Sequence, residues 1–257
     1  MAQPYSARSR AIEPFHVMAL LARANELQAA GHDVIHLEIG EPDFTTAEPI
    51  IQAGQAALAN GKTRYTAARG LPQLREAISG FYQQRYGLSV DPERILITPG
   101  GSGALLLASS LLVDPGKHWL LADPGYPCNR HFLRLVEGAA QLVPVGPEVR
   151  YQLTADLVAK HWDQDSVGAL VASPANPTGT ILTREELAGL SGAIKARDGH
   201  LVVDEIYHGL TYGTDAASVL EVDDDAFVLN SFSKYFGMTG WRLGWLVAPP
   251  AAVSELE

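Results

Sequence analysis

Short, uninterrupted apolar runs recur along the second half of the chain, and longer stretches with helical periodicity separate them. These runs are RILIT (94–98), HWLLA (118–122), AAQLVPV (139–145), VGALVA (167–172), LVVD (201–204), AFVL (226–229) and LGWLVA (243–248). Their length and composition are typical of strands buried on both faces of a parallel sheet. GGSGALLLASSLL indicates a glycine-rich turn that leads into a helix, and TREELAGLSGAIKARD indicates another helix. We therefore expect an α/β fold with a mainly parallel sheet.

The first third of the chain has a different pattern. Apolar residues at helical spacing predict a helix over 15–30 that stops at Gly31, and further helices over about 49–59 and 72–86. The last of these opens with proline, which suits the first turn of a helix. VIHLEI (34–39) is apolar and alternating, and predicts a strand.

Composition narrows the functional classes. With 257 residues and 47% hydrophobic content, the chain can form one sizeable core with room for a small lobe. A net charge of -10 argues against nucleic-acid binding, which needs clustered Lys and Arg. No apolar run approaches the roughly 18 residues that cross a bilayer, and the first residues lack a secretory signal. The lone Cys128 suits a reducing compartment, so we expect a cytoplasmic protein without membrane contact.

The 8 histidines do not predict a metal site. His32 and His36 are four residues apart, but this segment runs into a predicted strand, where that spacing does not converge on one ion. The chain contains neither CxxC nor HExxH. We expect the histidines to serve at the surface or in hydrogen bonds.

Candidate chemistry lies where the predicted strands end, because ligands of parallel α/β sheets bind beyond the carboxyl ends of the strands. Gly100, Gly101 and Gly103 follow the first strand and open a helix, which suits a phosphate cradle and equally suits a tight turn. Asn176 stands between Pro174 and Pro177 in SPANPTGT. The prolines make its amide a rigid hydrogen-bonding group, although a polar turn would also explain the sequence.

The next two strand ends carry ionisable side chains. Asp204 follows three apolar strand residues, so its carboxylate must pair with a cation, take up a proton or cap a helix, and Tyr207 can reach the same cavity. Lys234 follows AFVL closely. Burial would lower its pKa and free its amine as a nucleophile, whereas a surface position would keep it solvated. Its aromatic neighbours favour burial, and hydroxyls with an arginine nearby could bind an anion: Ser231, Ser233 and Arg242.

Together these strand ends describe one planar ligand. It carries a phosphate for the glycine turn and Arg242, a ring nitrogen for Asp204, a ring hydroxyl for Asn176 and Tyr207, and a carbonyl for Lys234. A lysine that forms a Schiff base and an acid that pairs with a pyridinium nitrogen are the protein features that go with pyridoxal phosphate. The residues therefore predict a pyridoxal-phosphate site.

From about residue 12 to its end, the chain resembles the fold-type I, class I/II aminotransferases, the aspartate aminotransferase-like family of pyridoxal-phosphate enzymes. Seven motifs stand in the family's order: IGEPDF, TRYTAARGLPQLREAI, TPGGSGAL, DPGYP, SPANPTGT, VVDEIYHGL and SFSKYFGMTGWRLGW. The resemblance implies three α-β-α layers around the mainly parallel sheet. It also implies an N-terminal arm and first small-domain segment over 1–44 and a cofactor-binding large domain over 45–257, with the small domain incomplete.

The resemblance also implies roles for particular residues. Lys234 would hold the cofactor as a Schiff base and move the substrate's Cα proton, Asp204 would keep the pyridine nitrogen protonated, and Tyr207 would be the third catalytic residue. Asn176 would bind the phenolic oxygen together with Tyr207, and Tyr126 would stack on the ring unless it only fills the core. The phosphate contacts would come from Gly101, Ser102, Gly103, Ser231, Ser233, Arg242 and, from the partner subunit of a homodimer, Tyr65. Gly40 and Asn176 would contact the substrate.

The resemblance ends with the chain at PPAAVSELE, where the family continues into the rest of the small domain. That part carries the arginine that binds the substrate α-carboxylate, so we expect a fragment or a truncated product that binds cofactor and turns over poorly. The implied reaction moves an amino group between an L-amino acid and a 2-oxo acid. The alternatives are a C–S lyase performing β-elimination on the same scaffold, a ligand sensor, and a non-catalytic fragment that needs a partner.

Overall fold

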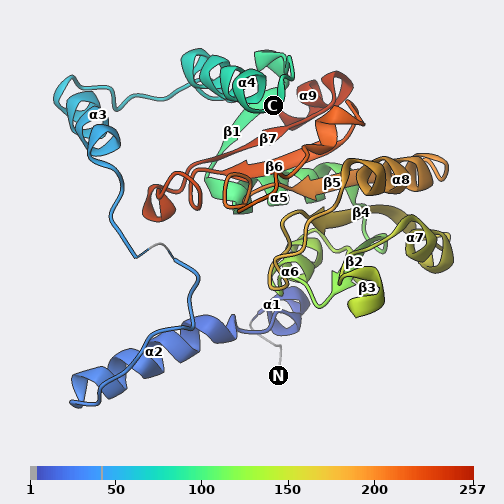
Figure 1. The fold of residues 1–257 in the computed structure, drawn as a ribbon, viewed down its shortest axis with the longest axis horizontal. Coiled ribbons are helices and arrows are strands. Elements are labelled where there is room, and N and C mark those ends of the chain that lie inside the picture. The colour runs from blue at the N-terminus through green and yellow to red at the C-terminus, as the bar shows by residue number, and fades with distance from the viewer. Residues whose placement is uncertain (1–4, 42) are drawn as a thin grey trace.

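One seven-stranded sheet organises the computed structural model, which describes residues 5–41 and 43–257 (Figure 1). The strand order is β1-β7-β6-β5-β4-β2-β3. β7 runs antiparallel to its neighbours β1 and β6, and every other neighbouring pair is parallel. The expected α/β fold with a mainly parallel sheet is therefore confirmed. The strands are β1 (Ile95–Thr98), β2 (His118–Asp123), β3 (Ala139–Pro144), β4 (Ser166–Ala172), β5 (His200–Asp204), β6 (Phe227–Ser231) and β7 (Gly244–Val247).

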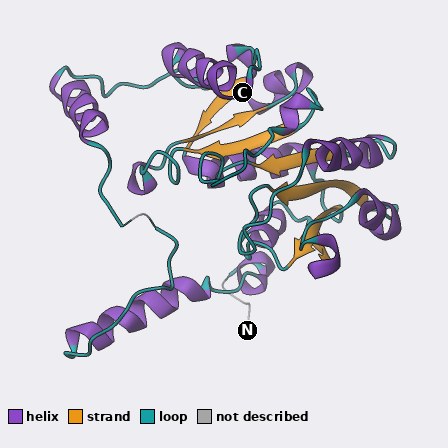
Figure 2. Ribbon diagram, in the orientation of Figure 1, coloured by secondary structure: helices purple, strands orange, loops and turns teal. Residues whose placement is uncertain are grey.

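Helices cover the sheet on both faces (Figure 2). Successive strand residues point to opposite faces, so Val203 belongs to the core beneath α4, α7 and α8, while Val202 belongs to the core beneath α5 and α6. This alternation explains why the strands are apolar throughout. The helices are α1 (Ala7–Ala11), α2 (His16–Ala29), α3 (Glu48–Ala59), α4 (Pro72–Tyr86), α5 (Gly100–Leu112), α6 (Asn129–Leu135), α7 (Ala155–His161), α8 (Arg184–Lys195) and α9 (Pro250–Leu256).

Local sequence signals fix several of these helix ends. Thr183 caps α8 by accepting a hydrogen bond from the Glu186 N–H, and the Glu186 side chain accepts the Thr183 N–H in return. Pro72 occupies the first turn of α4, and Gly87 ends that helix with a left-handed φ of 70°. The predicted helices over 15–30, 49–59 and 72–86 are therefore confirmed.

The strand predicted over 34–39 is absent from the described residues, and that prediction was wrong. A strand needs a hydrogen-bonding neighbour, and residues 34–39 pair with no strand of the sheet. Ile35 and Leu37 are 82% and 88% exposed instead. This segment and α2, which buries no residue, extend away from the sheet (Figure 1).

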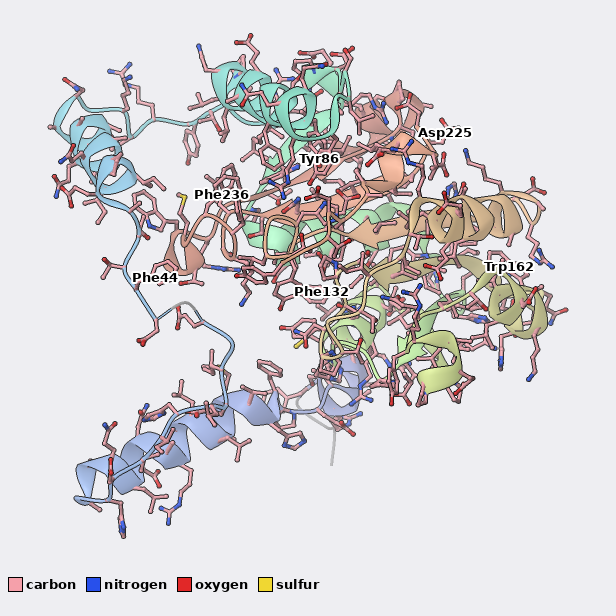
Figure 3. All side chains as sticks on the ribbon, viewed as in Figure 1. Phe44, Tyr86, Phe132, Trp162, Asp225 and Phe236 are labelled. Carbon is pink, nitrogen blue, oxygen red and sulfur yellow. The ribbon has the colours of Figure 1, made fainter. Side chains whose placement is uncertain are left out.

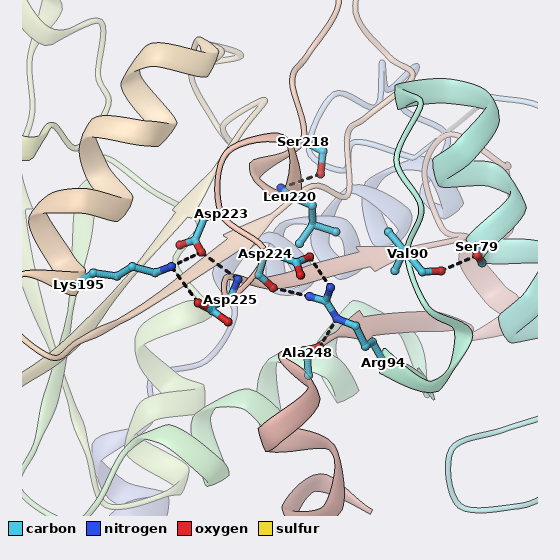
Figure 4. Close-up of polar contacts among 10 residues, drawn as sticks. All are labelled: Ser79, Val90, Arg94, Lys195, Ser218, Leu220, Asp223, Asp224, Asp225 and Ala248. Atoms are coloured by element: carbon cyan, nitrogen blue, oxygen red, sulfur yellow. Dashed lines mark hydrogen bonds and ion pairs between the residues drawn. The ribbon is translucent and has the colours of Figure 1, made fainter.

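Charged side chains join the loops at the edge of the sheet where β5 and β6 begin (Figure 4). The Lys195 amine at the end of α8 donates to Asp223 and, at 3.1 Å, to Asp225. Arg94 pairs with Asp224 and donates from its Nε to the Ala248 carbonyl at 2.9 Å. These contacts connect the loop before β6 to the end of α8 and to the residue before β1. The candidate site lies at the opposite edge of the sheet, where the parallel strands end.

Candidate active site

Three neighbouring strands deliver the predicted polar residues to one edge of the sheet. In the pairing register, Asp204 at the end of β5 lies beside Ala172 of β4 and Leu229 of β6. Asn176 follows β4 and Lys234 follows β6, so both leave the sheet at the edge where Asp204 stands. The carboxyl ends of parallel strands are where such folds bind ligands.

The start of α5 has the features of an anion cradle. Pro99 occupies the N-cap position, and its side chain accepts no hydrogen bond from the first N–H groups of the helix. Gly100 adopts a φ of 76°, and a Cβ added there would lie 2.6 Å from Arg242 Nη2. The guanidinium therefore lies against the helix start, in a space that only glycine leaves open. A Cβ on Gly101 would lie 3.7 Å from the Ser231 Cβ, so the end of β6 borders the same space.

Buried hydroxyls line this end of the site. Ser231 Oγ lies 2.8 Å from Ser233 Oγ and accepts the Ser233 N–H at 3.1 Å, and both serines are buried. Ser102 is exposed on the first turn of α5. A Cβ on Gly103 would lie 2.6 Å from the Pro99 ring, so this glycine allows the helix start to pack closely.

The Lys234 amine is held in place without a carboxylate partner among the described residues. Its Nζ donates to the Gly40 carbonyl at 2.8 Å. Partial burial lowers the pKa of Lys234, the nearby positive charge of Arg242 lowers it further, and the charge of Glu41 acts in the opposite direction. A lowered pKa increases the fraction of neutral, nucleophilic amine at neutral pH.

The Asp204 carboxylate lacks a cation. Crowding by protein atoms raises the pKa of Asp204 from 3.8 to about 6, and the charge of the adjacent Glu205 contributes in the same direction. The Ile206 N–H donates to Asp204 Oδ1 at 3.0 Å. The residue keeps some exposed surface, and no Lys or Arg in 5–41 or 43–257 forms an ion pair with it. A ligand that brings a positive charge would therefore complete this part of the site.

Asn176 and Tyr207 meet beside Asp204. The Asn176 amide donates to the Tyr207 hydroxyl at 3.1 Å. Burial raises the pKa of Tyr207, with the Asp204 charge adding to the shift. Burial also raises the pKa of Tyr126, and the nearby charges of Tyr207 and Asp204 raise it further. Tyr126, Asn176, Asp204 and Tyr207 therefore lie in one region of the site. Tyr126 and Asn176 also border a cavity of about 130 Å³ beyond β2 and β4.

One predicted site residue lies apart from this group. Tyr65, in the loop between α3 and α4, projects fully into solvent. The fold does not bring it to Lys234 within one chain. In contrast, Gly40 is 194 positions from Lys234 in the sequence and contacts its amine directly.

Glu205, which is not among the predicted site residues, belongs to the surroundings of the site. It is fully buried, and its Oε1 accepts the Val219 N–H and the Ser218 hydroxyl, both at 2.9 Å. Burial raises the pKa of Glu205 from 4.5 to about 8. The sequence contains a signal for this, because two consecutive acids at the end of an apolar strand point to opposite sides, so one of them is expected to face the interior.

The donor set fits pyridoxal phosphate. The free N–H groups of α5 and the Arg242 guanidinium suit a phosphate dianion, and the uncompensated Asp204 carboxylate suits a protonated ring nitrogen. The Asn176 amide suits a phenolic oxygen and the Lys234 amine suits an aldehyde. Across residues 5–41 and 43–257, no group of three or more His, Cys, Asp or Glu is arranged to hold a metal ion, and no helix is long and apolar enough to cross a membrane.

Comparison with known proteins gives consistent matches. The family model for aminotransferase class I and II matches residues 32–257. The chain is 42% identical over 240 residues to a valine–pyruvate aminotransferase of Mycobacterium tuberculosis, covering 93% of this chain and 62% of that protein. It is 37% identical to the (5-formylfuran-3-yl)methyl phosphate transaminase of Methanocaldococcus jannaschii, covering 92% and 61%. The chain thus spans about three fifths of the length of these relatives.

Solved structures share the fold. An aminotransferase from Mycobacterium tuberculosis superposes with a TM-score of 0.95 at 40% identity, covering 99% of this chain and 66% of that one. Aspartate aminotransferase from Thermus thermophilus with maleate superposes with a TM-score of 0.94 at 33% identity, covering 99% and 67%.

Proposed function

Because the chain belongs to the class I and II aminotransferase family, we propose that the whole protein is a pyridoxal-phosphate-dependent aminotransferase acting on an L-amino acid and a 2-oxo acid. The observation that carries the proposal is the pair formed by Lys234 and Asp204. One offers an amine with a lowered pKa and the other a carboxylate without a cation, and neighbouring strands deliver both to one edge of the sheet.

Pyridoxal phosphate, when bound, supplies an aldehyde for amine condensation and a ring that withdraws electrons from the substrate's Cα. Lys234 would hold the aldehyde through its amine and would afterwards carry the Cα proton, because this amine is neutral more readily than that of a solvated lysine. Asp204 would hold a proton on the ring nitrogen through its negative charge. Asn176 and Tyr207, already hydrogen-bonded at 3.1 Å, orient the phenolic oxygen.

The remaining residues bind and orient. Tyr126 would cover one face of the ring. Gly40, whose carbonyl accepts a hydrogen bond from the Lys234 amine at 2.8 Å, would line the substrate carboxylate with its backbone. Asn176 contacts the substrate as well as the cofactor. The phosphate would be held by the α5 turn and by the end of β6 with the segment that follows it, through Gly101, Ser102, Gly103, Ser231, Ser233 and Arg242.

We further propose a homodimer in which Tyr65 completes the phosphate site of the other subunit. The full exposure of this tyrosine supports the proposal, because its side chain is free to enter a neighbouring molecule. Residues 1–44 would form the arm and the first small-domain segment, and 45–257 the large domain. The exposure of Ile35 and Leu37 supports that division, since these side chains have no core in the described residues.

Trapping of the cofactor tests the proposed function. The 257-residue chain is incubated with pyridoxal phosphate and reduced with borohydride, and the labelled peptide is identified by mass spectrometry. We expect the label on Lys234, its loss in Lys234→Ala, and its retention in Lys160→Ala, which removes an exposed lysine on α7. A label on another lysine, or a label that survives in Lys234→Ala, contradicts the proposal.

Amino acids added to the loaded chain then test the reaction. Formation of pyridoxamine phosphate together with a 2-oxo acid indicates amino transfer. Release of ammonia with the oxo acid indicates β-elimination instead, and contradicts the aminotransferase assignment.

A further inference from the structure

Residues before α3 lie against the loop that carries Lys234. The Thr46 hydroxyl donates to the Gly237 carbonyl at 2.7 Å and accepts the Trp241 indole N–H at 3.1 Å. A Cβ on Gly54 in α3 would lie 2.8 Å from the Trp241 ring, so α3 packs on the same turn. Phe44 of this segment (Figure 3) also borders the loop, because a Cβ on Gly237 would lie 3.6 Å from the Phe44 ring. These contacts fix the segment relative to the loop.

Thr239 connects the two ends of the proposed site. Its hydroxyl donates to Glu41 Oε1 at 2.5 Å, and its carbonyl accepts the Arg242 Nη1–H at 3.1 Å. Glu41 is the neighbour of Gly40, whose carbonyl holds the Lys234 amine. The short 3-10 turn Thr239–Trp241 leads directly to Arg242, whose φ is 53°. One threonine therefore links the segment beside the lysine to the arginine beside the α5 helix start.

Glu41 also acts through its charge. Burial and the charge of Arg242 lower the pKa of Lys234, while the charge of Glu41 raises it. Arg242 and Glu41 are the two charged groups that act on this amine, and both are bound to Thr239. Movement of the Thr239 turn would therefore change the position of both charges relative to the amine.

We propose that Glu41 and Thr239 are positioning residues, which hold the Gly40 carbonyl against the Lys234 amine and Arg242 against Gly100. The inference rests on the proposed function, because the geometry they hold is that of the proposed cofactor site. Neither residue is expected to contact the reacting atoms. Their effect is to keep the lysine end and the phosphate end of the site at a fixed separation before the cofactor arrives.

Substitutions at two positions separate the hydrogen bond from the charge. Thr239→Val removes the hydroxyl at nearly constant volume, while Thr239→Ser keeps it. Glu41→Gln keeps an acceptor for Thr239 and removes the negative charge. Glu76→Gln, on the exposed side of α4, is the control for loss of a carboxylate elsewhere.

The affinity of each chain for pyridoxal phosphate is measured by quenching of tryptophan fluorescence. We expect Thr239→Val to weaken binding about tenfold, as for loss of one hydrogen bond to a charged group, and Thr239→Ser to restore it. The pH dependence of borohydride-trapped adduct at Lys234 gives the second readout. Glu41→Gln should move its midpoint to lower pH, because the charge that raises the pKa of Lys234 is gone.

The outcomes distinguish this inference from the proposed function. If the unaltered chain traps no cofactor on Lys234, the proposed function fails and this inference fails with it. If the unaltered chain traps it but Thr239→Val binds as tightly, or Thr239→Ser binds as weakly as Thr239→Val, only the positioning role is overturned. Should Thr239→Val not fold, the Glu41→Gln profile decides, and a midpoint equal to that of Glu76→Gln overturns the inference.

Discussion

The buried Glu205 carboxyl should make the stability of the protein depend on pH. It is fully buried, and its pKa is raised by that burial from 4.5 to about 8. The neighbouring His208 does not supply a positive charge to pair with it: its Nδ1 lies 3.7 Å from Glu205 Oε2, but burial lowers the pKa of His208 to about 4. At neutral pH the folded state therefore keeps Glu205 protonated, whereas the unfolded chain ionises it.

The sign and size of the effect follow from proton linkage. A carboxyl whose pKa is raised on folding stabilises the fold fully below its unfolded pKa, and this contribution is lost as pH rises toward the folded pKa. For Glu205 the loss runs from pH 4.5 to about pH 8. At about 1.4 kcal/mol per pH unit, the loss between pH 6 and pH 8 amounts to about 2 to 3 kcal/mol.

Glu205→Gln isolates this contribution. The amide keeps an oxygen for the Val219 N–H and the Ser218 hydroxyl and does not ionise. Urea unfolding of both chains at pH 6, 7 and 8, followed by tryptophan fluorescence and circular dichroism, gives the free energies of unfolding. We expect the stability of the variant relative to the unaltered chain to rise by about 2 to 3 kcal/mol between pH 6 and pH 8. Parallel pH profiles for the two chains would refute the reasoning, and Glu76→Gln should follow the unaltered chain throughout.

Two further predictions concern the proposed cofactor site. Gly100→Ala should weaken pyridoxal phosphate binding at least about tenfold, because the new Cβ meets Arg242 Nη2 at 2.6 Å on a backbone with φ 76°. A fluorescence titration checks this, and unchanged affinity would show that Arg242 does not hold the phosphate from that position. Asp204→Asn should weaken the same binding about tenfold to a hundredfold by removing the charge that pairs with the ring nitrogen. Equal affinity of the Asn variant and the unaltered chain would remove Asp204 from its proposed role.

The sequence was sufficient to predict the sheet because its strands are short, apolar and punctuated by glycine or polar residues. It failed at 34–39, where the alternation of Ile35 and Leu37 is that of a strand but no strand of the described sheet lies beside them. Alternation describes a single segment, whereas a strand is a property of a pair. The helices α6 and α7 were missed for a related reason, since seven residues show too little helical periodicity to be recognised.

The same distinction separates the parts of the site. Ser231, Lys234 and Arg242 could be identified together because they stand within twelve positions around one strand end. The hydrogen bond between Thr239 and Glu41 could not be predicted from the sequence. It joins residues 198 positions apart, and no local sequence pattern at either residue indicates it. Contacts of this kind arise only when the fold brings the segment before α3 onto the loop after β6.

Asp204 and Glu205 show how adjacent acids acquire different uses. Burial raises the pKa of both carboxyls, so both resist ionisation in the folded protein. Glu205 faces the interior, where Ser218 and Val219 satisfy its oxygens and no ligand can reach it, so it stays protonated and the cost appears in stability. Asp204 keeps some exposed surface beside Asn176 and Tyr207, so the ring nitrogen of the proposed cofactor would reach it and hold it ionised. In the proposed site, binding of a protonated pyridine ring would remove the cost of burying the Asp204 charge, so that cost would add to the affinity for the ring.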